Sequence, residues 1–132
     1  MRRRTLLAGI LALPAAVRAD DQSDLMDAAA QLAGALSDGR AGAFFEPIDR
    51  SLPDHDKLQD YVNALVAQAE VTSSVQPVSF KGSSADFDWD MTLRARDGAG
   101  ASENRRATIS MRIARKKIVS LTPIDFFAPM RT

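Results

Sequence analysis

Asp125 is the carboxylate in the most unusual sequence setting, because it lies inside the otherwise apolar segment 123–127. An acid among apolar neighbours is costly unless it is hydrogen-bonded. It therefore either caps backbone amides or faces a pocket, where it could act as a general base. Tyr61 and Trp89 each combine a large apolar body with one polar tip, so they could line a ligand cavity or belong to the core.

Three further acids, Asp86, Asp88 and Asp90, alternate along one predicted strand and therefore share one of its faces. Together they could bind a cation or, with raised pKa values, transfer protons. The other interpretation is a solvated face that pairs with basic residues of neighbouring strands, each pair contributing little. The basic residues in question are Arg94, Arg96, Arg106 and Arg112.

Several kinds of chemistry are excluded by residue types that the sequence lacks or holds once. It has no cysteine, which removes thiol nucleophiles, thiolate metal sites and iron–sulfur ligation. Its single histidine, His55, stands between two acids at a predicted helix start and is expected at the surface. One histidine cannot build a His-rich zinc site, and no Gly-x-Ser-x-Gly stretch is present. We expect neither a metal nor a cofactor.

The first nineteen residues are typical of an export signal. Three arginines (2–4) precede an apolar run over 6–16, and Val17-Arg18-Ala19 is a small-x-small cleavage site. As a helix the run spans about 16 Å, roughly half a bilayer's hydrocarbon core. We expect cleavage before Asp20, a periplasmic or secreted protein, and no membrane span afterwards. The alternative is a buried N-terminal helix, and the twin arginines in Arg3-Arg4-Thr5-Leu6-Leu7 make export by the twin-arginine route possible.

Cleavage would change the charge of the protein. The signal holds four of the 17 basic residues and none of the 17 acidic ones, so 13 basic and 17 acidic residues remain, a net charge of −4. A mildly acidic domain lacks the positive potential that attracts nucleic acid or anionic lipid, so neither is expected as a partner. Residues 20–132 are enough for one domain.

The spacing of apolar residues predicts an α+β fold, with helices first and strands after them. A 3.6-residue period indicates helices over 20–37 and from Asp54, and Phe44 and Phe45 between them anchor a short turn. From Val71 the period changes to two, which predicts strands over 71–80, 86–96, 105–115 and 118–122. Pro77 indicates an edge strand or a bulge.

The second predicted strand has one clearly apolar face, formed by Phe87, Trp89, Met91, Leu93 and Ala95. The third predicted strand also has an apolar row, so we expect the two strands to pair as a hairpin with one apolar face. The helices must cover that face.

This order of elements, with the closing stretch Ile118-Val119-Ser120-Leu121-Thr122-Pro123-Ile124-Asp125-Phe126-Phe127, resembles the nuclear transport factor 2-like (polyketide cyclase-like) superfamily. The resemblance covers residues 20–132. It implies a cone in which a curved antiparallel sheet wraps the first long helix and leaves a pocket at the open end. The superfamily includes isomerases, dehydratases, cyclase-like enzymes and non-catalytic binding domains, so the fold alone does not choose a function.

Two functions follow as hypotheses. The first is an exported, non-catalytic domain that binds a small apolar molecule in its cone, against Tyr61, Trp89, Met91 and Asp125, or that forms a homodimer through its sheet. The alternative is an isomerase-like or cyclase-like enzyme with Asp125 as general base and Tyr61 as proton donor.

Overall fold

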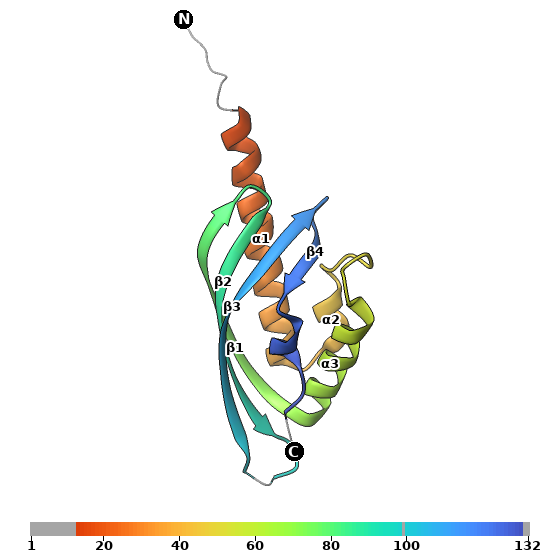
Figure 1. Ribbon diagram of the computed structural model, residues 1–132. Coiled ribbons are helices and arrows are strands. Elements are labelled where there is room, and N and C mark those ends of the chain that lie inside the picture. The colour runs from red at the N-terminus through yellow and green to blue at the C-terminus, as the bar shows by residue number, and fades with distance from the viewer. Residues whose placement is uncertain (1–12, 99, 131–132) are drawn as a thin grey trace, which may run out of the picture.

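A computed structural model describes residues 13–98 and 100–130 of the chain (Figure 1). Three helices come first, and a four-stranded sheet and a short 3-10 helix follow. Their bounds are α1 (Leu13–Asp38), α2 (Ala41–Phe45), α3 (His55–Gln68), β1 (Ala69–Lys81), β2 (Ser84–Ala95), β3 (Ser102–Ala114), β4 (Lys117–Thr122) and η3 (Ile124–Phe127). The predicted α+β class is confirmed.

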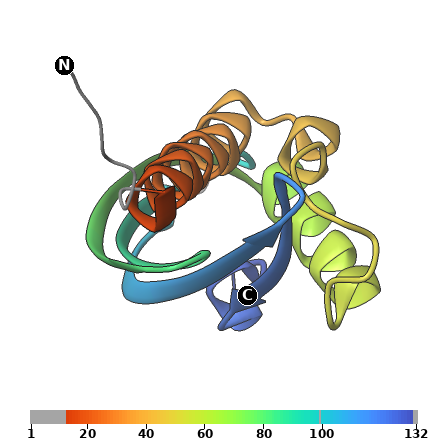
Figure 2. The same cartoon turned by 90° about the horizontal axis from the view of Figure 1, so that it is seen from above.

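The sheet is antiparallel, with its strands in chain order from β1 to β4. Seen from above, it curls around α1, while α2 and α3 lie across its remaining open side (Figure 2). The predicted cone is therefore confirmed. Pro77 lies on edge strand β1, and the register with β2 shifts between Pro77 and Ser79. Both predicted positions of the proline are therefore found. Proline has no backbone N–H to donate, so within a sheet it is tolerated on an edge strand or at a bulge.

Helix α1 begins at Leu13, seven residues before the predicted start, and runs through the predicted cleavage site. Residues 1–12 of the predicted signal lie outside the described residues. The predicted apolar stripe is confirmed from Leu25 onward, where Leu25, Leu32 and Leu36 are fully buried. At the other end Gly39 takes a φ of +71°, and the backbone N–H of Arg40 donates to the carbonyl of Ala35. This is the left-handed helix end that glycine favours.

The core lies between the concave face of the sheet and the helices. Phe87, Trp89, Met91 and Leu93, which point inward from β2, are at most 1% exposed. From the opposite side η3 inserts Phe127, whose ring centroid lies 5.3 Å from Trp89 and 5.4 Å from Phe44 in edge-to-face contacts. Side chains of the last described segment therefore fill the middle of the cone.

No helix among residues 13–98 and 100–130 is long and apolar enough to cross a membrane.

The aromatic contacts of Phe127 predict a large stability effect. Phe127→Ala would remove a fully buried ring and leave a cavity, so we expect it to lower the free energy of unfolding by about 3–5 kcal/mol. Guanidinium denaturation of the two proteins measures this. The control is Val78→Ala, since Val78 is 56% exposed on β1 and should change stability by less than about 0.5 kcal/mol. Equal effects of the two changes would contradict the account of the core.

Candidate functional site

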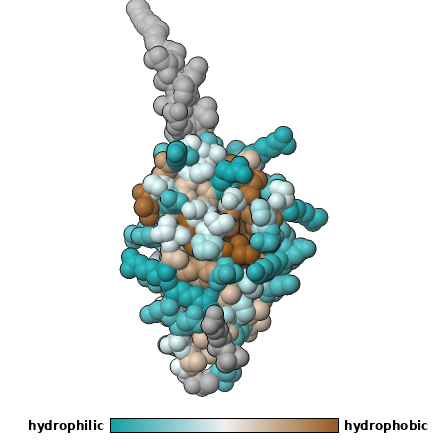
Figure 3. Space-filling model, viewed as in Figure 1, coloured by the Kyte–Doolittle hydropathy of each residue, from teal (hydrophilic) through white to brown (hydrophobic). Residues whose placement is uncertain are grey.

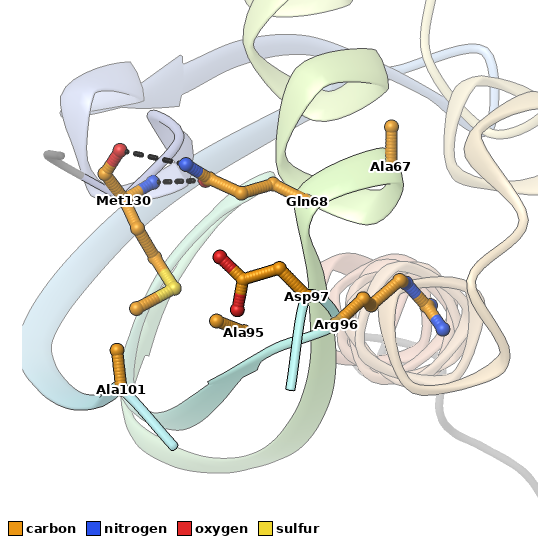
Figure 4. Close-up of a pocket in the computed structure, with 7 residues that line it drawn as sticks. All are labelled: Ala67, Gln68, Ala95, Arg96, Asp97, Ala101 and Met130. Carbon is orange, nitrogen blue, oxygen red and sulfur yellow. Dashed lines mark hydrogen bonds between the residues drawn. The ribbon is translucent and has the colours of Figure 1, made fainter. Parts of the chain in front are cut away.

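A pocket of about 570 Å³ opens at the rim of the cone, where α3 ends and the loop between β2 and β3 begins. We call it the rim pocket. Seven residues line it, and Figure 4 shows them as sticks: Ala67, Gln68, Ala95, Arg96, Asp97, Ala101 and Met130.

Backbone contacts between segments distant in sequence form the walls of the rim pocket. Helix α3 passes directly into β1, and the N–H of Arg96 donates to the carbonyl of Gln68 over 2.9 Å. The side chain of Arg96 strengthens this junction, because its Nε donates to the carbonyl of Val66 over 3.0 Å. Across the loop, the N–H of Ala95 donates to the carbonyl of Ala101 over 3.0 Å. These hydrogen bonds connect the end of β2 to the end of α3 and to the far side of the loop between β2 and β3.

The lining of the rim pocket is apolar with a polar margin. Three alanines and the Met130 side chain supply the apolar surface. Among the polar groups, the Gln68 amide is hydrogen-bonded to the backbone of Met130, and Arg96 turns away from Asp97 toward the helix ends (Figure 4). The Asp97 carboxylate points toward the space between Met130 and Ala101 (Figure 4). Such a lining suits an apolar body that carries one polar group.

The structure divides the four residues predicted to form a ligand pocket into two pairs. Trp89 and Met91 are 0% exposed, so they belong to the core and no ligand reaches them in this conformation. The Trp89 Nε1–H donates to Ser73 Oγ over 2.7 Å, which satisfies its one polar atom inside the protein. Tyr61 and Asp125 lie together outside the core.

Tyr61 and Asp125 line a second depression, of about 520 Å³, which we call the polar pocket. The Tyr61 hydroxyl donates to Asp125 Oδ1 over 3.3 Å. Lys57 Nζ lies 5.5 Å from the Tyr61 ring centroid. A hydrogen bond with the Tyr61 side chain and the negative charge of Asp125 raise the pKa of the Lys57 amine. Asp125 is exposed at this depression, and Tyr61 is the hydrogen-bond partner that the sequence does not reveal.

Arg105 is the important residue of this region that the sequence analysis missed. Its Nη1 donates to the carbonyls of Phe126 and Ala128, its Nη2 donates to that of Pro129, and its Nε donates to Glu103 Oε2 over 2.6 Å. A signal was present, because Arg105 continues the inward-facing alternation of β3. A charged residue in phase with an apolar row needs partners inside the fold.

The acidic row of β2 is a hydrogen-bonded outer face. Asp86 Oδ1 accepts a hydrogen bond from Ser110 Oγ over 2.7 Å, and Asp88 Oδ1 accepts one from Thr108 Oγ1 over 3.3 Å. Asp90 stands opposite Arg106 in the strand register. Within the described part of the chain, no three His, Cys, Asp or Glu side chains are grouped so that they could hold a metal ion. These contacts favour the solvated-face interpretation over a cation site.

His55 is less exposed than the sequence suggests. Its side chain is 20% exposed and its ring centroid lies 5.4 Å from that of Phe45, so it partly covers α2.

The apolar sheet face that motivated the homodimer hypothesis is covered inside the protein. Figure 3 shows a surface on which hydrophobic residues form small separate patches among hydrophilic ones. Among the described residues, the large hydrophobic side chains that remain exposed are Met26 and Val78.

Comparison with known proteins supports the fold. By sequence, no protein family and no characterised protein matches. By structure, the chain is similar to Δ5-3-ketosteroid isomerase from Mycobacterium sp., with a TM-score of 0.60, 9% identity, and 74% of this chain and 89% of that chain covered. A computationally designed 17-OHP binder has a TM-score of 0.58 at 11% identity, covering 73% and 86%. AclR from Streptomyces galilaeus has a TM-score of 0.59 at 11% identity, covering 79% and 77%. The chain has the nuclear transport factor 2-like fold.

Proposed function

We propose that this protein is an exported, non-catalytic domain that binds a small, largely apolar molecule in the rim pocket. The observation that carries the proposal is the rim pocket itself. Its volume of about 570 Å³ lies within the roughly 300–1,000 Å³ range of small-molecule sites, and its lining combines apolar walls with few polar groups.

The state of the polar groups favours binding over catalysis in the rim pocket. Arg96 Nε and the Gln68 amide are both hydrogen-bonded to backbone groups, so their role there is structural. Asp97 is the acidic group that lines this pocket, and the rest of its polar lining is the Gln68 amide and the Arg96 guanidinium. The designed 17-OHP binder has the same fold, which supports the capacity of this fold to hold a small ligand.

Binding of a neutral apolar dye tests the proposal. We expect Nile red to bind the protein with a rise in fluorescence, and Ala101→Trp to weaken binding by roughly tenfold or more because the indole would fill the pocket. The matched control is Ala64→Trp, on the exposed side of α3, which should bind the dye normally. No binding by the unchanged protein, or equal binding by the two variants, would contradict the proposal.

Export is the part of the proposal that rests on residues 1–19. Support comes from the arginines, the short apolar run and the small-x-small site. The described core residues of α1 begin at Leu25, so cleavage before Asp20 would remove none of them. Expressed with its full N-terminus in a Gram-negative host, the protein should be recovered from the periplasm. Mass spectrometry should then find Asp20 as its first residue. Intact protein that remains in the cytoplasm would count against export.

A second candidate function, isomerase-like catalysis, is favoured by one observation, the 3.3 Å hydrogen bond between Tyr61 and Asp125 in the polar pocket. The binding proposal expects the protein not to isomerise a Δ5-3-ketosteroid, as followed by ultraviolet absorbance of the conjugated product. The enzyme alternative expects turnover that falls about 10²- to 10⁴-fold in Asp125→Asn. The control is Asp60→Asn on an exposed position of α3. Turnover lost in Asp125→Asn alone, with unchanged stability, would overturn the non-catalytic assignment.

A further inference from the structure

The last described segment, residues 123–130, is attached to the rest of the protein in two different ways. We call it the strap. Its inner part is apolar, since Phe127 is 0% exposed and Phe126 is 7% exposed within the aromatic core. Its outer part, residues 128–130, is only half-buried and is held by polar contacts.

Gln68 holds the outer end of the strap. Its Nε2 donates to the carbonyl of Met130 over 3.0 Å, and the N–H of Met130 donates to Gln68 Oε1 over 2.6 Å. One side chain thus satisfies both backbone groups of one residue, as a neighbouring strand would. Figure 4 shows both hydrogen bonds, together with the Met130 side chain that extends from them along the pocket.

The same two residues are walls of the rim pocket. The contacts that dock the outer strap therefore also give the pocket its shape. Half-buried polar contacts open at lower cost than core packing. Since Arg105 holds the carbonyls of Ala128 and Pro129, the end of the strap at Met130 is the part that can separate while Phe127 stays in place.

We propose that the strap is a ligand-coupled wall of the rim pocket, and that Gln68 is the positioning residue that sets it. This inference rests on the proposed binding function. A ligand in contact with Met130 stabilises the docked strap, and by linkage the docked strap raises the affinity for the ligand by the same factor.

The test combines dye binding with hydrogen exchange. We expect Gln68→Ala to raise the Kd for Nile red about tenfold, the value of two modest hydrogen bonds. The matched control, Gln59→Ala, changes an exposed glutamine of the same helix and should leave the Kd unchanged. Saturating Nile red should slow exchange of the Met130 amide proton several-fold in the unchanged protein, and this slowing should be lost in Gln68→Ala.

The outcomes of dye binding distinguish failure of the binding function from failure of the coupling. If the unchanged protein does not bind the dye, the proposed function itself fails. If it binds while Gln68→Ala binds equally well or more tightly, the coupling is overturned and the binding function stands. Met130→Ala is the second variant, because it removes the wall but keeps both backbone hydrogen bonds, and it too should raise the Kd. An unchanged Kd in Met130→Ala would also overturn the coupling.

Discussion

Burial of the Phe127 ring is the interaction on which the rest of the structure depends. The ring packs edge-to-face against Trp89 of the sheet and Phe44 of α2, and it joins the two sides of the cone. Removing such a ring from water is worth about 1.5–3 kcal/mol. The ring fills the middle of the cone, and the rim pocket lies at the edge of the cone. The same anchor places Asp125 beside Tyr61 and leads Met130 to the end of α3.

Much of the fold could be predicted because it follows from local patterns. The helical stripe of α1, the inward row of β2 and the bulge at Pro77 each depend on residues close in sequence. The content of the cone could not be predicted in this way. The alternation around Trp89 and Met91 shows that these residues are covered, but a ligand and a protein side chain produce the same pattern. Phe126 and Phe127 contact the Trp89 ring, and both come from a turn of 3-10 helix that follows Pro123.

The candidate sites were predictable only in part. Tyr61 and Asp125 were each recognisable by residue type, but their contact spans 64 residues and needs the tertiary fold. Arg105 carried a signal in its phase along β3, whereas Gln68 carried none, because a glutamine at a helix end is ordinary in sequence. The rim pocket arises where alanines leave volume unfilled between three chain segments. These alanines follow no periodic pattern along the chain, so the sequence could not predict the pocket.

The central claim is that a ligand binds in the rim pocket, because side chains of the strap fill the interior of the cone. The most direct test is two-dimensional NMR of the ¹⁵N-labelled protein during titration with Nile red. The account predicts amide shifts that centre on Ala67, Ala95, Ala101 and Met130, while the Trp89 indole N–H stays hydrogen-bonded to Ser73 and unshifted. Shifts that centre on Trp89 and Phe127 instead would mean that the ligand displaces the strap and enters the cone, which would contradict the account.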